Sequence, residues 1–395
     1  MSSPWLRGVL YAAGVSMLLA GAASAAPRTP VDDSEVVESL PSVGGWSLEQ
    51  RRLRRELTAR PRDARVAIEA AQAYLELARS QGDARYAGYA MGALQAWDGM
   101  PPAQTPAGIL VMHATVAQFL HDFDGAETTL KQALEKQPSN AQAWITLATI
   151  LRVRGRYADS DAACQSLAAV APPLYAQACL AENAGLRGNT AGALKTFTAL
   201  LADPALQATA QASTRQWLTT SVAEVEELAG RPAAAEAAYR RALALERSSY
   251  LLLAYSDFLL QQKRPAEVPA LLDKEPRSDA VLLRLAIVES SRSSTTAAAA
   301  EMKARIEAEA LRPGITAVHA RESALFALDV QNDAKAALEL ARVNVRLQRE
   351  PIDLLIFARA AAAARDEAAR DEVRNLMKQI GLRDARVDAL DEAKR

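Results

Sequence analysis

The chain contains few side chains of the kinds that enzymes use as nucleophiles or metal ligands. Its 395 residues include 3 histidines and 2 cysteines. His113 and His121 are separated by two helical turns, and His319 lies far along the chain. Zinc proteases need two histidines one helical turn apart beside a glutamate, and this arrangement is absent. We therefore predict no metal site, with His113 packed and His121 exposed at a turn.

Other catalytic motifs are missing as well. The sequence has no glycine-rich phosphate loop, no nucleophile-elbow serine and no cysteine–histidine constellation. We predict a protein that is not an enzyme and needs no cofactor. The alternative is an enzyme whose site lies in the irregular segments 202–215 or 290–315, but neither segment contains histidine or cysteine.

Two charged runs could suggest binding sites. The run DDSE at residues 32–35 offers carboxylates, but the surrounding stretch is polar with Pro and Gly, which favours a flexible leader over a calcium loop. The run RRLRRE at residues 51–56 could form a basic docking patch. Because Leu53 and Leu57 supply a buried side, a solvated helix face is the favoured interpretation.

Composition narrows the class of partner. Half of the residues are apolar, which excludes disorder throughout, and alanine dominates the apolar set. Lys+Arg number 46 and Asp+Glu 47, so the net charge is −1. Without a basic excess or a polybasic run, we expect neither nucleic acid nor lipid headgroups as partners.

The first 25 residues have the layout of a secretory signal peptide. A basic start, an apolar core and small residues follow in that order, and cleavage is expected between Ala25 and Ala26. The apolar run is shorter than the roughly 20 residues that a spanning helix needs, which disfavours an uncleaved anchor. We expect an exported protein without stable membrane insertion, in a bacterial periplasm, with residues 26–46 as a flexible leader.

A pattern of small residues recurs along the chain. Successive members are separated by 34, 33, 42 and 33 residues, and a larger residue follows each of them four positions later. Turn residues such as Gly155 precede them, and prolines such as Pro172 follow. Small residues suit the points where paired helices cross, because a large side chain would push the helices apart. The small residues are Ala126, Ser160, Ala193, Ala235 and Val268.

This pattern resembles the tetratricopeptide-repeat family. The unit NAQAWITLATILRVRGRYADSDAACQSLAAVAP departs from the family pattern at Ser160 and Cys164, where alanine and an aromatic residue are usual. The resemblance implies an all-α, right-handed superhelical solenoid with a concave groove lined by the first helix of each pair. The signature residues in this unit are Trp144, Leu147, Ala148, Gly155, Tyr157, Leu167 and Pro172.

The resemblance also sets the expected domain organisation and function. We predict a solenoid over residues 47–276, then degenerate helical repeats with a capping helix over 277–395. The family implies binding and assembly roles, so the leading hypothesis is a periplasmic adaptor that holds a segment of a partner protein. The alternative is an accessory subunit of a machine that assembles cell-envelope polysaccharide or the outer membrane.

The two cysteines belong to neighbouring helices of this arrangement. Cys164 lies late in one unit and Cys179 in the first helix of the next. Export would permit oxidation, and a disulfide could add about 3 kcal/mol by closing the loop between them. Two buried thiols are the alternative, since the Cα separation is not visible in a sequence.

The expected groove residues lie off the packed face of each first helix. The later ones are acidic, and a concave row of carboxylates would focus negative potential. We therefore predict a partner segment with basic residues opposite residues 174–276; solubilising charges on an exposed face are the alternative. The expected groove residues are Ile145, Thr149, Arg152, Glu182, Thr220, Glu224, Glu227 and Asp257.

Overall fold

A computed structural model describes residues 48–291, 296–310 and 315–392, and every regular element in these ranges is a helix. The compact unit that begins at Arg52 contains the features discussed below. The predicted signal peptide, its cleavage between Ala25 and Ala26, the leader at 26–46 and the DDSE run all lie outside the described residues.

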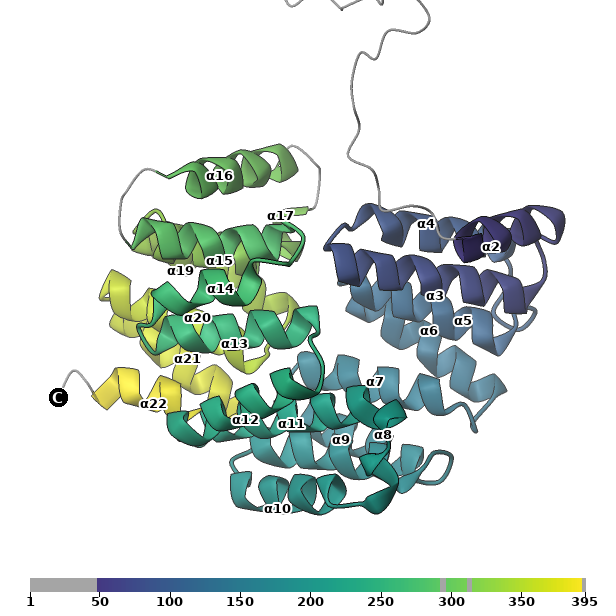
Figure 1. Ribbon diagram of the computed structural model, residues 1–395, viewed down its shortest axis with the longest axis horizontal. Helices are drawn as coiled ribbons and strands as arrows, with labels where there is room; N and C mark the ends of the chain where they lie inside the picture. Colours follow the sequence, from purple (N-terminus) through teal and green to yellow (C-terminus); the bar gives the residue numbers. More distant parts are fainter. Residues whose placement is uncertain (1–47, 292–295, 311–314, 393–395) are drawn as a thin grey trace, which may run out of the picture. The chain divides into compact units, whose positions relative to one another are not determined.

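The helices follow one another as antiparallel pairs (Figure 1). Short 3₁₀ helices at Gln95–Trp97, Pro204–Gln207, Thr209–Gln211 and Pro265–Glu267 extend some connections. Among the described residues, α2 (Leu48–Ala59) precedes the first pair, α17 (Ile315–Val318) is a short connector and α22 (Ala385–Glu392) comes last. The pairs are α3 (Ala64–Gln81) with α4 (Arg85–Leu94), α5 (Ala107–Phe119) with α6 (Phe123–Lys136), α7 (Ala141–Val153) with α8 (Tyr157–Ala168), α9 (Pro173–Leu186) with α10 (Thr190–Leu201), α11 (Ala212–Leu228) with α12 (Pro232–Leu245), α13 (Ser249–Gln261) with α14 (Val268–Leu272), α15 (Asp279–Ser290) with α16 (Ala297–Ala310), α18 (Ala320–Asp329) with α19 (Ala334–Leu347), and α20 (Pro351–Ala364) with α21 (Glu367–Ile380).

The recurring small residues lie where the paired helices cross. All five are completely buried, from Ala126 to Val268. The larger residues four positions later, such as Phe197 and Tyr239, fill the core beside them. Ser160 fits a crossing because its hydroxyl donates to the carbonyl oxygen of Ala148 at 2.8 Å, which satisfies the buried polar group. The repeat register predicted from the sequence is confirmed.

The turn between the two helices of a pair keeps one backbone conformation even where glycine is absent. Gly155 has a φ of 73°, in the left-handed region where a Cβ is normally unfavourable. The equivalent positions without glycine have the same sign of φ, so the turn geometry overrides the steric preference of the side chain. These residues are His121 (63°), Lys263 (59°), Asn332 (55°) and Arg365 (55°).

The C-terminal helices pack against the turns of the middle pairs. A Cβ added to Gly188 would lie 3.0 Å from Cγ of Arg383. The backbone N–H of Arg383 donates to the carbonyl oxygen of Leu186 at 2.9 Å, and that of Arg349 donates to Val153 at 2.7 Å. These bonds satisfy carbonyl groups at the ends of α9 and α7, which have no partner within their own helices. In Figure 1, α22 lies beside α11 and α12, and α22 contacts α11.

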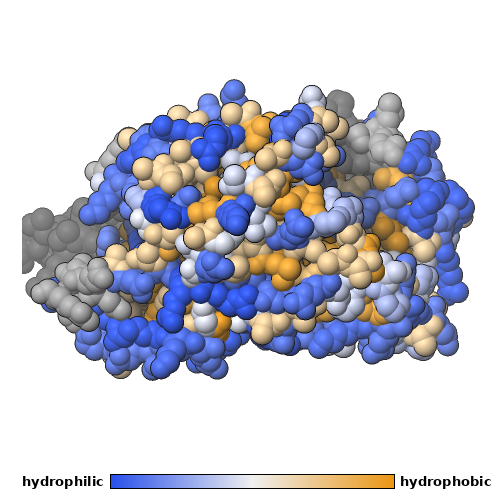
Figure 2. Space-filling model, turned by 90° about the horizontal axis from the view of Figure 1, so that it is seen from below, coloured by the Kyte–Doolittle hydropathy of each residue, from blue (hydrophilic) through white to orange (hydrophobic). Residues whose placement is uncertain are grey.

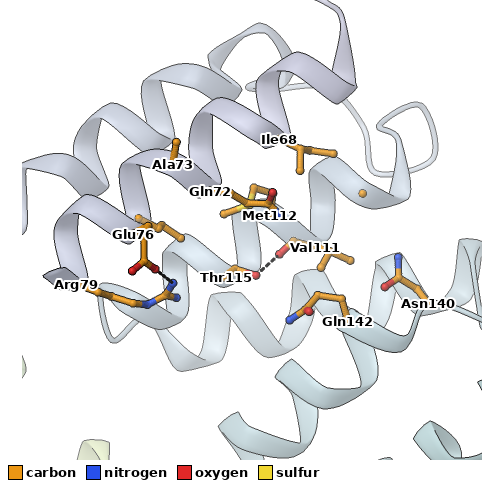
Figure 3. Close-up of a pocket in the computed structure, with 12 residues that line it drawn as sticks. Ile68, Gln72, Ala73, Glu76, Arg79, Val111, Met112, Thr115, Asn140 and Gln142 are labelled. Carbon is orange, nitrogen blue, oxygen red and sulfur yellow. Dashed lines mark hydrogen bonds and ion pairs between the residues drawn. The ribbon is translucent and has the colours of Figure 1, made fainter. Parts of the chain in front are cut away.

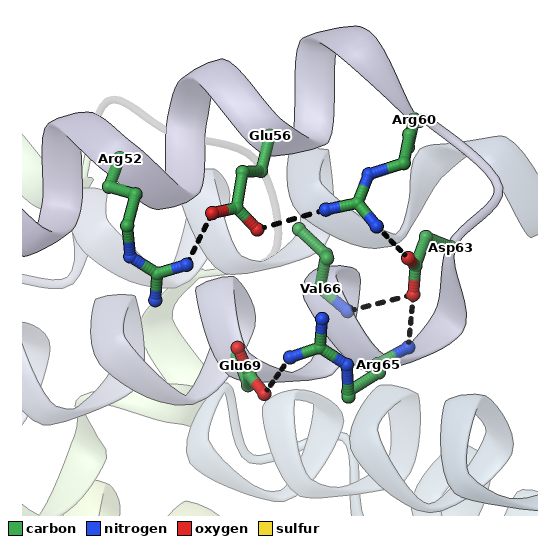
Figure 4. Close-up of polar contacts among 7 residues, drawn as sticks. All are labelled: Arg52, Glu56, Arg60, Asp63, Arg65, Val66 and Glu69. Carbon is green, nitrogen blue, oxygen red and sulfur yellow. Dashed lines mark hydrogen bonds and ion pairs between the residues drawn. The ribbon is translucent and has the colours of Figure 1, made fainter.

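The predicted solvated face of α2 is confirmed. Leu53 is buried, whereas Arg54 and Arg55 are exposed. Figure 4 shows the ion pairs that continue from this helix into the next: Arg60 bridges Glu56 at 3.1 Å and Asp63 at 2.9 Å. The Asp63 carboxylate also accepts from the backbone N–H groups of Arg65 and Val66, and Arg65 pairs with Glu69, so Asp63 caps the start of α3.

Two sequence expectations need correction. His121 was expected to be exposed, but it is partly buried and stacks on Phe123, with ring centroids 5.6 Å apart. Burial lowers the pKa of His121 as a consequence. The segment 290–315 was considered irregular, but most of it forms α16.

Candidate partner-binding groove

A hollow lies on the first helices of the first three pairs. Its volume is about 600 Å³, and α3, α5 and the start of α7 supply its walls (Figure 3). First helices are the elements that line the concave side of a helix-pair solenoid. The lining residues are Ile68, Gln72, Ala73, Leu75, Glu76, Arg79, Gly108, Val111, Met112, Thr115, Asn140 and Gln142.

The pocket combines an apolar floor with polar ends. Val111 and Met112 are almost completely buried, so they form a fixed surface. Gln72 and Gln142 are exposed, and Glu76 faces Arg79 with 4.0 Å between carboxylate and guanidinium. Such a site can bury an apolar side chain of a ligand while amide groups bond to its backbone.

The sequence analysis did not predict this pocket, although the repeat register could have been used to find it. The expected groove began at Ile145 and Thr149. One repeat of 34 residues earlier, the equivalent residues are Val111 and Thr115, and both line the pocket. Extending the same face to the preceding pair would have identified it.

The first three predicted groove residues lie on α7 and are all partly buried. Ile145 packs against the core of its repeat, and the Thr149 hydroxyl donates to the carbonyl oxygen of Ile145 at 2.9 Å. Arg152 reaches the next pair and forms an ion pair with Glu182. These residues join neighbouring repeats more than they offer free groups to a ligand.

The predicted acidic row is mostly paired within the chain. Glu182 binds Arg152 and also accepts from the Ser221 hydroxyl at 3.0 Å, so it links α7, α9 and α11. Asp257 pairs with Arg284 of α15 at 2.6 Å. Substituting Glu182 would therefore disturb the contact between repeats in addition to any partner.

Glu224 is different because its partner is a tyrosine. The Tyr250 hydroxyl of α13 donates to this carboxyl group. Burial raises the pKa of Glu224 to about 8, and the nearby carboxylates Glu182, Glu227 and Glu350 add to the effect, while the tyrosine hydrogen bond opposes it. A carboxyl group that retains its proton near neutral pH therefore lies among three other acids.

Two predicted groove residues are buried instead of lining a groove. Thr220 is 2% exposed, and its hydroxyl bonds within α11. Glu227 is 8% exposed, accepts from the Tyr239 hydroxyl and pairs with Arg386. The packing of α22 against α11 explains the burial of Glu227, and no sequence pattern indicates that contact.

An aromatic row on the same helices was also missed. Tyr175, Trp217 and Tyr250 stand seven residues before Glu182, Glu224 and Asp257 on α9, α11 and α13. Tyr175 stacks against Trp217 with ring centroids 6.4 Å apart and planes inclined by 20°. Tyr250 is 63% exposed. Repeating the groove register two helical turns toward the start of each helix would have found them.

The two cysteines are joined in a disulfide between α8 and α9. Their Cα atoms are 5.9 Å apart, and both side chains are buried. The bond connects the second helix of one pair to the first helix of the next. It therefore fixes the stacking of two neighbouring pairs.

The described residues hold no cluster of three or more histidine, cysteine or acidic side chains that could bind a metal ion. Within the same ranges, no helix combines the length and apolar character needed to cross a membrane. On the face shown in Figure 2, apolar and hydrophilic side chains are interspersed.

The chain was compared with known families, curated proteins and solved structures. No protein-family model and no curated protein matches the sequence. Among solved structures, a tetratricopeptide repeat protein from Parabacteroides merdae ATCC 43184 aligns at 16% identity over 64% of this chain and 98% of its own, with a TM-score of 0.36. pilF of Pseudomonas aeruginosa aligns at 14% identity over 61% and 91%, with a TM-score of 0.33. A chain of the APC/C hetero-tetramer Cut9–Hcn1 aligns at 13% identity over 81% of this chain and 63% of that one, with a TM-score of 0.50.

The molecule is thus an α-solenoid of stacked helix pairs. Its pairing, its turn geometry and the solved structures that it resembles define it as a tetratricopeptide-repeat fold. Solenoids of this kind present extended concave surfaces on which other proteins bind.

Proposed function

We propose that the protein is a non-enzymatic adaptor that holds a segment of a partner protein on its first helices. The pocket of about 600 Å³ on α3, α5 and α7 carries this proposal, because it is the place where a partner's apolar side chain can be buried. The exposed glutamines at its rim suit a bound backbone. The acidic side chains of α9, α11 and α13 extend the same face, and Glu224, which has no basic partner among the described residues, favours a partner segment that contains basic residues.

Site-specific photo-crosslinking tests where the partner lies. A crosslinker at Gln142, on the first helix of its pair, should capture the partner, while one at Gln165, exposed on the second helix, should not. Gln72→Trp should fill the pocket and weaken capture about tenfold or more, since one buried side chain is worth about 1.5–3 kcal/mol. Gln165→Trp serves as the matched control. Equal capture from both faces, or no effect of Gln72→Trp, would show that the pocket is not the binding site.

We further propose that this adaptor acts after export, in the periplasm. The order of basic, apolar and small residues before Ala26 supports this location. Mass spectrometry of the mature protein should find Ala26 at its amino terminus. Recovery of the full-length chain from membranes would contradict the proposal. Co-purification with a large envelope assembly would indicate an accessory subunit of that assembly instead of a free adaptor.

A further inference from the structure

Three consecutive first helices carry the same two-residue combination. An aromatic ring is followed seven residues later by an acid in Tyr175/Glu182, Trp217/Glu224 and Tyr250/Asp257. Seven residues are nearly two turns of an α-helix, so ring and acid share one face. This face continues the register of Thr115 and Gln142, which line the pocket.

Two of the three rings, those of Tyr175 and Tyr250, are accessible to a ligand. Tyr250 is 63% exposed and Tyr175 is 40% exposed. They are two of the four large apolar side chains that are exposed in the described part of the chain. Stacking on Trp217 holds Tyr175 in a fixed orientation. An exposed ring held in place by a neighbouring ring is a surface on which a ligand can rest with little reorganisation.

The acids on and around this row differ in whether they have a basic partner. Glu182, Glu227 and Glu350 each pair with an arginine: Arg152, Arg386 and Arg321. Glu224 lies near these three acids and has no basic group within ion-pair distance among the described residues. Its hydrogen bond from Tyr250 supplies a donor but no positive charge. Asp257 pairs with Arg284, so Glu224 is the acid of the three in the row without a basic partner, and it is the position where a ligand's cation can meet an unpaired carboxyl group.

We propose that this aromatic–acid row receives lysine or arginine side chains of the bound partner segment. A cation over an aromatic face is attracted by the ring's quadrupole, and Glu224 adds Coulombic attraction when it ionises. A neutral or acidic segment gains neither. The inference rests on the proposed adaptor function and specifies the chemistry of its partner.

The ionisation of Glu224 gives the proposal a second signature. Near neutral pH this acid retains its proton, because burial and its acidic neighbours raise its pKa to about 8. A bound cation favours the charged form, so binding should release protons. The groups that face Glu224 are Tyr250, Glu182, Glu227 and Glu350.

A defined peptide tests the inference on the full chain. The probe is a fluorescent decapeptide of alternating arginine and serine, with glutamine–serine and glutamate–serine peptides of equal length as controls. The arginine peptide should bind about tenfold or more tightly than the glutamine peptide, and the difference should shrink at high salt. Calorimetry in two buffers of different ionisation enthalpy should detect proton release below pH 8, and Glu224→Gln should abolish it.

Substitutions then test whether the aromatic rings contribute to peptide binding. Tyr175→Leu with Tyr250→Leu should weaken arginine-peptide binding about tenfold, while Tyr250→Phe, which keeps the ring, should retain most of it. Tyr89→Leu, which removes a 54% exposed tyrosine from α4, is the matched control and should change nothing. Equal binding of the arginine and glutamine peptides, or parental binding by the double variant, would overturn the inference.

Partner capture by the two variants distinguishes this inference from the proposed function. If Gln72→Trp prevents partner capture and the tyrosine double variant does not, the adaptor function stands and the aromatic–acid row is excluded. If the double variant alone prevents capture, the row binds the partner and the pocket is excluded. If neither prevents capture, both proposals are wrong.

Discussion

Arg386 and Glu227 form an ion pair across 159 residues of sequence. Nη1 of the arginine lies 2.6 Å from Oε2 of the glutamate, whose second oxygen accepts from the Tyr239 hydroxyl. The pair joins α22, the last helix, to the end of α11. Because Glu227 is 8% exposed, the arginine neutralises a charge that water can hardly reach.

Arg386→Met should therefore destabilise the protein strongly. It leaves two buried carboxylates, Glu227 and Asp384, without their counter-charge, and breaking a buried pair typically costs about 3–5 kcal/mol. Urea denaturation measures the loss. Adding Glu227→Leu should recover only part of the stability, because the buried carboxylate of Asp384, 2.6 Å from Arg386, still lacks its counter-charge. Arg65→Met, which removes the exposed partner of Glu69 in Figure 4, is the control and should cost less than about 1 kcal/mol. Equal losses for Arg386→Met and Arg65→Met would show that α22 does not depend on this pair.

A substitution in a turn between paired helices should, by contrast, increase the stability of the protein. Lys263 has a φ of 59°, where a side chain is unfavourable and glycine is not. Lys263→Gly should stabilise the protein by about 0.5–1 kcal/mol, since relief of the left-handed conformation outweighs the extra flexibility of the unfolded chain. Gly188→Asn is the informative counterpart. Asparagine tolerates the φ of 90°, but its Cβ would lie 3.0 Å from Arg383, so this variant should lose stability. A destabilised Lys263→Gly or a neutral Gly188→Asn in thermal melting would contradict this explanation.

The disulfide should stabilise the middle of the solenoid. In the chain-entropy model, closing the loop between Cys164 and Cys179, which are 15 residues apart, contributes about 3 kcal/mol. Reduction should lower the urea midpoint of the parent. A Cys164→Ala/Cys179→Ala variant should melt like the reduced parent and ignore reductant. Alkylation of both thiols in oxidised, denatured protein would show that the bond does not form.

The sequence allowed us to predict contacts between neighbouring helices, but not contacts between helices that are distant along the chain. Ala126 and Phe197 could be placed because the helix-pair register repeats at short range, and their burial follows from the crossing of adjacent helices. The pairing of Glu227 with Arg386 follows no repeat, so an acid assigned to the groove by register is buried.

The candidate site shows the same limit. The register assigned the buried Thr220 and Glu227 to the groove, and it could not show which acids have partners. Glu182 and Glu224 occupy equivalent positions, yet one binds Arg152 and the other a tyrosine hydroxyl. That difference depends on the side chain presented by the next helix. Periodicity within a helix contains no information about it.

The pH dependence of stability should reveal Glu224 even without a partner. Its folded pKa of about 8 lies above the ordinary value, mainly because burial disfavours the charged form. Between the unfolded pKa near 4.5 and the folded value, the folded state holds a proton that the unfolded state has lost. The stability that this group contributes is therefore fully present below about pH 4.5 and decreases as the pH rises towards 8. Glu224→Gln keeps a neutral group beside Tyr250 and removes the titration.

Urea denaturation of parent and variant at several pH values between 4 and 9 tests this assignment. The variant should gain stability relative to the parent as the pH rises through this range and then maintain a constant difference. Comparing the two proteins cancels the contribution of other groups, such as His113 and His121, whose burial lowers their pKa values. Glu135→Gln, at an exposed position of α6, is the matched control and should follow the parent at every pH. A constant difference between Glu224→Gln and the parent from pH 4 to 9 would mean that folding does not raise the pKa of Glu224, and the expected proton release on binding would then be absent.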